Sequence, residues 1–172
     1  DPSCHSSQNE QDNRYYALFS NAPMLEPSTP EEAREMTRIG FDISEELHLP
    51  ILLRTTTRLS HARGPVTLST LNKSKIRGHF EKDTLLARES ITARIKHPIL
   101  LKKMKKAEKI SEKSQFNSIF NIGKPTDVGI VSSGVSVKYV KEIAELLKLN
   151  VKVLKLGMTH PIPTNLCKQF IK

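Results

Sequence analysis

The chain lacks several features that would by themselves indicate a class of protein. Its 172 residues contain no Trp, only 5% aromatic residues and two cysteines, Cys4 and Cys167, which form no Cys-x-x-Cys pair. Neither a disulfide framework nor a four-thiolate iron-sulfur site can be built from two distant thiols. No apolar run approaches the roughly 20 residues that a membrane span requires. We therefore expect reduced thiols, a cytoplasmic location and no membrane contact.

The common signatures of nucleotide binding and hydrolysis are also missing. The sequence has no Gly-x-Gly-x-x-Gly, no glycine-rich loop ending in Gly-Lys-Ser or Gly-Lys-Thr, no His-Glu-x-x-His and no Gly-x-Ser-x-Gly. Each of these motifs would place phosphate-binding amides, paired zinc ligands or a nucleophilic serine in a known geometry. These functions therefore have no support in the sequence. The apolar share of 37% is nevertheless adequate for a packed core.

The positive charge is concentrated in one segment. The net charge is +9, but residues 73–113 alone hold 13 Lys plus Arg against 5 Asp plus Glu, which is +8, and the rest of the chain holds 14 against 13. Nucleic-acid-binding segments usually interleave such charge with aromatic residues, and Phe80 is the only aromatic residue here. We expect no specific nucleic-acid binding. A solvated helical face is the plainer interpretation, and docking of an acidic protein partner is the alternative.

The first part of the chain has the pattern of a strand, a helix and a second strand. Residues 24–25 stand between two prolines, as in a brief strand. Thr29 fits a helix N-cap, with Pro30 in the first turn and Glu32 three residues after the cap. Apolar or small residues then recur at helical spacing and form one predicted buried face: Ala33, Met36, Gly40, Ile43 and Leu47. The helix ends before Pro50, and residues 51–53 form a continuous apolar run typical of a buried parallel strand.

The last part of the chain predicts a complete strand-helix-strand unit. Residues 115–126 carry Asn, Gly and Pro without clear periodicity, so we place a linker there. Strands are expected at 128–132 and 151–156, with a helix over 136–149 between them and another helix beginning near Pro161. The inward face of the first of these helices is expected to comprise Tyr139, Val140, Ile143, Leu146 and Leu147. Strands alternating with helices indicate an α/β fold.

Two groups of polar residues are candidates for ligand binding. Residues 5–14 concentrate hydrogen-bonding groups of every type at a predicted strand-to-helix junction, where α/β folds bind ligands. Within them, Arg14 could pair with a carboxylate through two parallel hydrogen bonds. Arg54 and Thr56 alternate onto one side at the end of a predicted strand. The alternative for both groups is structural: a polar loop that caps a helix, and a strand that leaves the core through polar residues.

The residues themselves carry a more specific signal than their pattern does. The chain opens Asp1-Pro2-Ser3-Cys4-His5-Ser6-Ser7-Gln8-Asn9-Glu10-Gln11-Asp12-Asn13-Arg14-Tyr15-Tyr16. Four further stretches continue the signal: Pro23-Met24-Leu25-Glu26-Pro27, Leu52-Leu53-Arg54-Thr55-Thr56-Thr57-Arg58 with Ser60-His61, Ser132-Ser133-Gly134-Val135-Ser136, and Val153-Leu154-Lys155-Leu156-Gly157-Met158-Thr159. Together they resemble the large subunit of indolepyruvate ferredoxin oxidoreductases, in the 2-oxoacid:ferredoxin oxidoreductase superfamily. The usual opening of that family is Asp-Pro-Gly-Met-His-Ser-Ser-Gln-Asn-Glu-Gln-Asp, from which Ser3 and Cys4 depart mildly.

This resemblance implies an α/β fold in two parts. Residues 1–114 would be the second half of a thiamine-binding, pyrimidine-type parallel-sheet domain, with a basic helical connector at about 73–113. After the linker at 115–126, residues 127–172 would begin a domain like the carboxyl-terminal domain of transketolase. The chain would then be an internal fragment of the large subunit.

The resemblance also implies an enzyme that oxidatively decarboxylates aryl pyruvates such as indolepyruvate with coenzyme A and reduces ferredoxin. Its cofactors would be thiamine diphosphate, Mg²⁺ and 4Fe-4S clusters, and a second (beta) subunit would be its partner. The residues expected to bind the cofactor or the substrate are His5, Ser6, Gln8, Asn9, Asp12, Arg14, Arg54 and Thr56. Of these, Arg14 would hold the substrate carboxylate.

The remaining parts of such an active site are expected outside this chain. The glutamate that activates the aminopyrimidine would lie upstream and the magnesium motif downstream, so we expect no catalytic or metal residue here and no activity of the isolated chain. Two alternatives stay open. One is a related 2-oxoacid:ferredoxin oxidoreductase acting on pyruvate or a branched-chain oxoacid. The other is a non-catalytic interaction module that keeps the fold and binds a partner through its basic helix.

Overall fold

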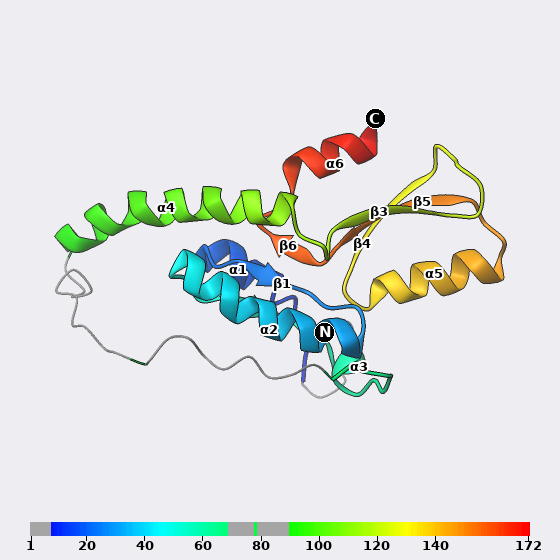
Figure 1. The fold of residues 1–172 in the computed structure, drawn as a ribbon, viewed down its shortest axis with the longest axis horizontal. Helices are drawn as coiled ribbons and strands as arrows, with labels where there is room; N and C mark the ends of the chain where they lie inside the picture. Colours follow the sequence, from blue (N-terminus) through cyan, green and yellow to red (C-terminus); the bar gives the residue numbers. More distant parts are fainter. Residues whose placement is uncertain (1–7, 69–77, 79–89) are drawn as a thin grey trace.

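The computed structural model describes residues 8–68, 78 and 90–172. The predicted site residues His5 and Ser6 and much of the basic connector therefore lie outside the described residues. Within the described part the elements are, in chain order, α1 (Arg14–Ser20), β1 (Met24–Leu25), α2 (Pro30–Leu47), β2 (Leu52–Leu53), α3 (Thr57–Ser60), α4 (Ser90–Glu112), β3 (Ser118–Ile122), β4 (Gly129–Ser133), α5 (Ser136–Leu146), β5 (Val151–Leu156), β6 (Met158–His160) and α6 (Thr164–Ile171) (Figure 1).

Two small mixed sheets organise the described residues. In sheet A the order is β2-β1-β6, with β1 and β2 parallel and β6 antiparallel to β1. In sheet B the order is β3-β5-β4, with β4 and β5 parallel and β3 antiparallel to β5. The α/β class and the predicted unit β4-α5-β5 are thus confirmed. Within the first part, β1 and β2 pair in parallel as expected, and sheet A is mixed because β6, from the last part of the chain, joins β1 in the opposite direction.

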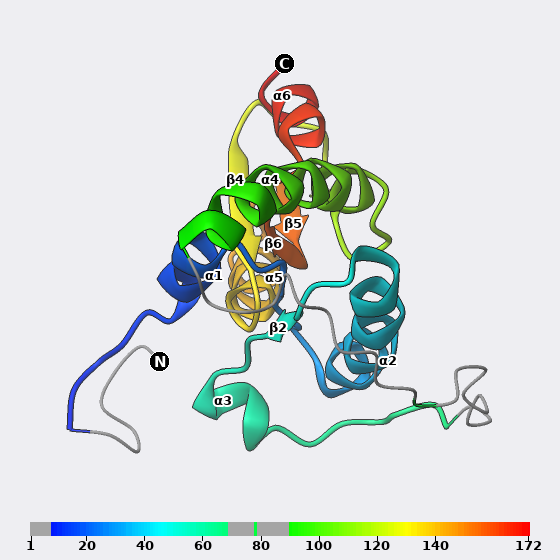
Figure 2. The ribbon, with the colours of Figure 1, turned by 90° about the vertical axis from the view of Figure 1, so that its left-hand side faces the viewer.

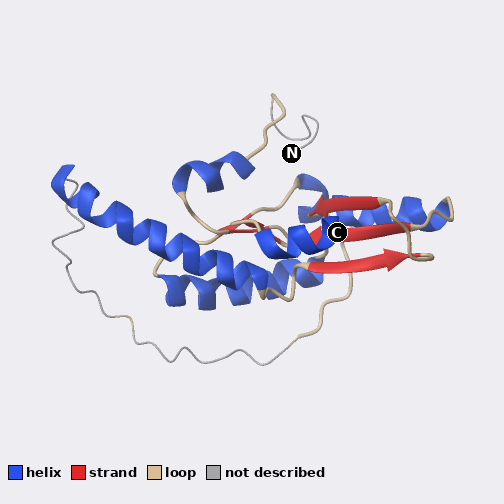
Figure 3. Ribbon diagram, turned by 90° about the horizontal axis from the view of Figure 1, so that it is seen from above, coloured by secondary structure: helices blue, strands red, loops and turns tan. Residues whose placement is uncertain are grey.

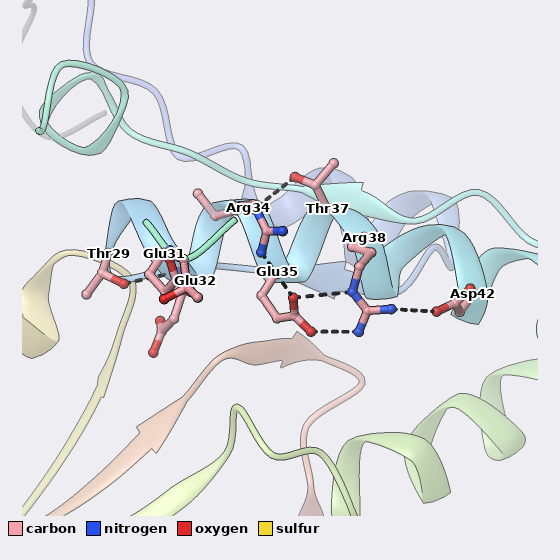
Figure 4. A network of polar contacts seen from close by, with 10 residues as sticks. Thr29, Glu31, Glu32, Arg34, Glu35, Thr37, Arg38 and Asp42 are labelled. Carbon is pink, nitrogen blue, oxygen red and sulfur yellow. Dashed lines mark hydrogen bonds and ion pairs between the residues drawn. The ribbon is translucent and has the colours of Figure 1, made fainter. Parts of the chain in front are cut away.

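Helix α2 begins and ends where its sequence predicts. The Thr29 hydroxyl accepts a hydrogen bond from the Glu32 amide at 3.0 Å, and Pro30 is the first helical residue. The helix ends at Leu47, after which His48 adopts a left-handed conformation with φ of 49°. Ion pairs join its exposed side chains, and Figure 4 shows Arg38 between Glu35 and Asp42. Four of the five residues predicted for its inner face are buried, Met36, Gly40, Ile43 and Leu47, whereas Ala33 in the first turn is only partly buried.

Helix α4 lies along α2 and covers one side of this core (Figures 1 and 2). Ala107 is fully buried against Ile43 and Leu47. Two lysines of α4 reach α2: the Lys103 ammonium donates to the His48 carbonyl at 2.9 Å, and Lys106 pairs with Glu46 at 3.0 Å. The basic helix is thus partly engaged within the fold. No helix among the described residues is long and apolar enough to cross a membrane.

Helix α5 covers one face of sheet B, but of the predicted inward residues only Val140 packs against the core, where it is partly buried. Val137 and Ala144 are buried, whereas Tyr139, Ile143, Leu146 and Leu147 are between 37% and 77% exposed. The second core forms between Ala144 and two residues of β5, Val151 and Val153. Helix α6 lies across the other face, where the Lys152 ammonium donates to the Phe170 carbonyl at 3.2 Å. Figure 3 shows sheet B at the opposite end of the molecule from the start of α4.

The segment expected to be a linker contains a strand of sheet B. Strand β3 lies within residues 115–126 and pairs with β5 over five residues. Just before it, the buried Asn117 amide donates to the Ser111 carbonyl at 2.8 Å, and its oxygen accepts from the amides of Gly157 and Met158 at 2.8 and 2.9 Å. This side chain ties the end of α4 to the turn between β5 and β6. The division into two domains stays a prediction.

Candidate functional site

A cavity of about 490 Å³ lies where the two sheets meet, at the carboxyl ends of three strands. Glu26 follows β1, Arg54 follows β2, and Ser133 ends β4. Parallel strands direct their carboxyl ends to one edge, and the loops beyond that edge are the usual ligand sites of α/β folds. The lining comprises Glu10, Gln11, Asp12, Arg14, Glu26, Arg54, Thr56, Val131, Ser132, Ser133, Val135, Ser136 and Leu156.

A buried ion pair forms the inner wall of the cavity. The Arg54 guanidinium donates to one carboxylate oxygen of Glu26 at 2.5 Å and to the Asn13 side-chain oxygen at 2.6 Å. The side chains of Arg54 and Glu26 are only 6% and 4% exposed. Removing one member of such a pair leaves an uncompensated buried charge, so each residue requires the other. Strands β1 and β2 are adjacent and parallel, which brings these two residues together.

Two buried oxygens of this wall have no hydrogen-bond partner among residues 8–68, 78 and 90–172. They are Oε2 of Glu26 and Oγ1 of Thr56, and both residues line the cavity. A buried polar atom without a hydrogen bond is uncommon in proteins and costs about 1–3 kcal/mol. Both residues line the cavity, but these two oxygens are themselves buried behind its surface.

The adjoining wall is the turn from β4 into α5. Gly134 has φ of +55°, and a Cβ built there would lie 2.5 Å from Oε1 of Glu26. A side chain at this position would be strained by its backbone and would collide with the carboxylate. Glycine thus lets the first turn of α5 approach Glu26 closely. The partial positive charge of a helix N-terminus favours a carboxylate at this position.

Asp12 and Arg14 form the outer rim. Nε and Nη2 of Arg14 donate to the two oxygens of Asp12 at 2.8 and 2.6 Å, while the two side chains are 50% and 38% exposed. The hydrogen bond from the Arg14 side chain lowers the pKa of Asp12 to about 2. The hydrogen bond to Asp12 is the main cause that raises the pKa of Arg14, and the negative charge of Glu26 raises it further. The rim pair therefore interacts electrostatically with the inner wall.

The structure brings together half of the site residues expected from the sequence. Asp12, Arg14, Arg54 and Thr56 line the cavity. Gln8 and Asn9 are exposed and do not line it, while His5 and Ser6 lie outside the described residues. The two parallel hydrogen bonds expected for Arg14 do form, but with Asp12. The binding roles of all eight residues stay predictions.

The sequence reasoning assigned no site role to Glu26 or to residues 132–136, although it quoted both stretches. For each, the sequence contained a feature that predicts a site residue. Glu26 is a charged residue directly after a predicted buried strand, and residues 132–136 follow the first strand of the predicted strand-helix-strand unit. Ligand sites of α/β folds form at the carboxyl ends of strands. The order of the predicted strands and helices along the sequence therefore identifies both positions as candidate site residues.

The chain is an α/β protein with a polar cavity at the carboxyl ends of its strands, which is the place where α/β folds usually bind ligands. Comparison with known proteins identifies relatives of the chain. The chain is 44% identical to the indolepyruvate oxidoreductase subunit IorA of Methanothermobacter thermautotrophicus over 172 residues, 45% identical to that of Thermococcus kodakarensis over 178, and 42% identical to that of Archaeoglobus fulgidus over 176. Each match covers 99% of this chain.

The resemblance read from the sequence is therefore confirmed: this chain is related, from end to end, to a segment of the IorA subunit of indolepyruvate oxidoreductases. The chain spans 27–28% of the length of these relatives. No protein-family model matches it.

Proposed function

We propose that this chain is part of a cytoplasmic indolepyruvate oxidoreductase that oxidatively decarboxylates aryl pyruvates. The observation that carries the proposal is the match to IorA subunits at 42–45% identity over essentially the whole chain. In the proposed reaction the 2-oxoacid loses carbon dioxide, its acyl group passes to coenzyme A, and the electrons pass through 4Fe-4S clusters to ferredoxin. A second (beta) subunit completes the enzyme, as the designation of the relatives as subunits suggests.

The composition of the cavity supports a role in binding the reactants. Its volume of about 490 Å³ lies within the range of small-molecule sites, roughly 300–1,000 Å³. Charged side chains of both signs line it. Thiamine diphosphate, when bound, supplies the carbanion that makes decarboxylation of a 2-oxoacid possible. In this proposal Asp12, which lines the cavity, binds the cofactor or the substrate, and so do His5, Ser6, Gln8 and Asn9, which precede it in the sequence.

Arg14 is the proposed anchor for the substrate carboxylate. Asp12 holds its guanidinium at the mouth of the cavity through Nε and Nη2, and the side chain remains half exposed. A guanidinium has five N–H donors, so it can bind a second carboxylate while Asp12 fixes its plane. The described residues contain no group of three or more His, Cys, Asp or Glu side chains placed to hold a metal ion, and we assign no Mg²⁺ ligand to them.

The proposal is tested on the polypeptide that contains this chain, purified anaerobically with its partner subunit. We expect reduction of ferredoxin, or of a viologen dye in its place, that requires indolepyruvate, coenzyme A and thiamine diphosphate together. The isolated 172-residue chain should be inactive in the same assay. A higher kcat/KM for pyruvate or a branched-chain oxoacid than for indolepyruvate would contradict the substrate assignment.

A further inference from the structure

Helix α4 has an outer face that takes no part in the cavity and that the described fold leaves uncovered. The buried residues of the helix are Ala107 and Ser111, and none of residues 90–106 is buried. Pro98 lies within this first part, where it removes one helical hydrogen bond. Most helices in proteins are stabilised by packing an apolar face against a neighbour. The first part of α4 therefore has less packing than such a helix normally requires.

The first part of the outer face carries a stripe of isoleucines. Ile91, Ile95 and Ile99 are four positions apart, so they lie along one side of the helix. They are 68%, 47% and 43% exposed. Exposed apolar residues are ordinary when they are scattered singly, whereas a continuous patch indicates a surface that binds another. Figure 3 shows the start of α4 at the end of the molecule opposite sheet B.

A lysine row, comprising Lys102, Lys105 and Lys109, continues the same side of the helix. The three residues are exposed. Among residues 8–68, 78 and 90–172, their ammonium groups have no ion-pair or hydrogen-bond partner. The neighbouring Lys103 and Lys106 differ, because they bond to α2. The lysine row thus faces away from the fold that the other two lysines help to hold.

The acidic residues of α4 pair with α6 rather than with the lysine row. Glu112 accepts hydrogen bonds from the amides of Asn165 and Leu166 at 2.6 and 3.1 Å. Glu108 accepts one from the Thr164 hydroxyl at 3.0 Å. The positive charge of the lysine row therefore stays unpaired on the outer face.

Isoleucines and lysines on one face define the chemistry of a partner. Stable protein interfaces join an apolar centre to a polar rim, so the matching surface is apolar beside the isoleucine stripe and acidic beside the lysine row. Nucleic acid fits less well, because isoleucines gain nothing from phosphates and α4 has no aromatic residue to stack on a base.

The lysine row also favours a separate molecule as the partner. Complementary charge mainly increases the rate at which two molecules meet, whereas a segment of the same polypeptide is already held nearby by the chain. Contacts with transient redox partners such as ferredoxin are small, and the isoleucine stripe suits the lasting contact of a subunit.

We propose that the outer face of α4 binds the second subunit of the enzyme, with the isoleucine stripe against an apolar surface and the lysine row against carboxylates. This inference rests on the proposed function, in which a second subunit completes the enzyme.

The first test identifies what lies against the lysine row in the assembled enzyme. A zero-length carbodiimide joins a lysine to a carboxylate only where the two are in contact, and mass spectrometry identifies both residues. We expect Lys102, Lys105 or Lys109 to be joined to Asp or Glu of the second subunit. Links from these lysines to the same polypeptide or a second copy of it alone, or no links at all, would overturn the inference.

The second test measures the affinity of the intact polypeptide for the second subunit at about 0.01 and 1 M salt, where screening lengths are about 30 and 3 Å. Lys102→Glu combined with Lys105→Glu should raise Kd about 10-fold or more at low salt, mainly through slower association, and much less at high salt. Ile95→Ala combined with Ile99→Ala should raise Kd about 10-fold at both salt concentrations, mainly through faster dissociation.

The control reverses two exposed lysines elsewhere, Lys124 after β3 and Lys138 of α5. Lys124→Glu combined with Lys138→Glu changes the net charge by the same amount and should leave Kd nearly unchanged. An equal loss of affinity in the two lysine double variants would mean that net charge alone attracts the second subunit, which contradicts the inference. If a variant fails to fold by circular dichroism, the cross-links of the unaltered enzyme decide.

The outcomes separate the inference from the proposed function. If the subunits assemble through α4 but oxidise no indolepyruvate, the proposed function is wrong and the interface stands. If the enzyme is active and every variant assembles as tightly as the unaltered protein, the interface is wrong and the function stands. A higher KM for ferredoxin with unchanged assembly in Lys102→Glu combined with Lys105→Glu, or binding of nucleic acid by the assembled enzyme through these lysines, would also overturn the inference.

Discussion

At the scale of single residues, the rim pair of Asp12 and Arg14 is the most local feature of the site. The two residues are separated by one position, and Asp12 also accepts a hydrogen bond from the Arg14 backbone amide at 3.1 Å. Such a pair can form wherever this short stretch adopts the same turn. It fixes the orientation of the guanidinium before any ligand arrives, which is an advantage for binding a planar carboxylate.

The pKa of Asp12 provides a direct test of this pair. The hydrogen bond from Arg14 lowers it from 3.8 to about 2, so its contribution to stability is present above about pH 4 and is lost as the pH falls through 2. Substitution Arg14→Gln should move the carboxyl titration back toward 3.8. An NMR titration of the Asp12 carboxyl carbon measures it, and Arg38→Gln on α2, which does not contact Asp12, is the control. A titration unchanged by Arg14→Gln would contradict the pairing.

At the scale of elements, α2 and α5 show when an apolar pattern predicts the buried face. Helix α2 has one apolar stripe, and that stripe is buried. Helix α5 has two candidates: Tyr139, Ile143 and Leu146 on one side, and Val137 and Ala144 on the other. The second is buried, because small side chains allow the helix to approach the sheet closely, where Ala144 contacts Val151 and Val153. The larger stripe, which the pattern favours, is exposed on the described part of the chain.

Asn117 is the residue on which several elements depend. It bonds to the end of α4 and to the turn between β5 and β6, where Gly157 is so close to Phe116 that a Cβ would lie 2.6 Å from that side chain. Asn117→Ala leaves buried amides unpaired, so we expect a loss of about 1–3 kcal/mol in the free energy of unfolding. Denaturant unfolding monitored by circular dichroism measures it. Asn121→Ala, at an exposed position of β3, should change stability by less than about 0.5 kcal/mol. Equal effects of the two substitutions would contradict this role.

At the scale of the whole molecule, several connections within the described residues join the parts of the chain around the two sheets, and three of them involve β5 or the turn that follows it. Strand β6 continues from β5 into sheet A, Asn117 bonds across the turn between them, and Lys155 of β5 pairs with Glu32 of α2. Burial raises the pKa of Glu32, but the hydrogen bonds from Lys155 and Ser28 outweigh it, so the pKa is lowered overall. The ion pair between Lys155 and Glu32 is therefore retained at neutral pH, and it weakens only as the pH falls below the ordinary pKa range of glutamate.

These connections predict that both sheets unfold together. Because the chain contains no Trp, a single introduced Trp reports on one region. We expect Phe41→Trp on α2 and Phe120→Trp in β3 to show fluorescence transitions at the same denaturant concentration, and each to coincide with the loss of helix measured by circular dichroism in the same variant. Two separate transitions within either variant would show instead that residues 1–114 and 127–172 fold as independent domains.

The sequence by itself determined the features that depend on residues close together along the chain. The cap and inner face of α2, the unit β4-α5-β5 and the relation to IorA subunits all follow from local pattern or from residue identity. Only the tertiary structure decided what depends on residues far apart. Glu26 and Arg54 are 28 positions apart and meet because β1 and β2 pair. The β3 strand is defined by its partner β5, and the cavity exists because β6 returns the chain to sheet A. Periodicity reports which side of an element is apolar, but the contacts that bury one face and leave another open are set by the neighbours that the fold supplies.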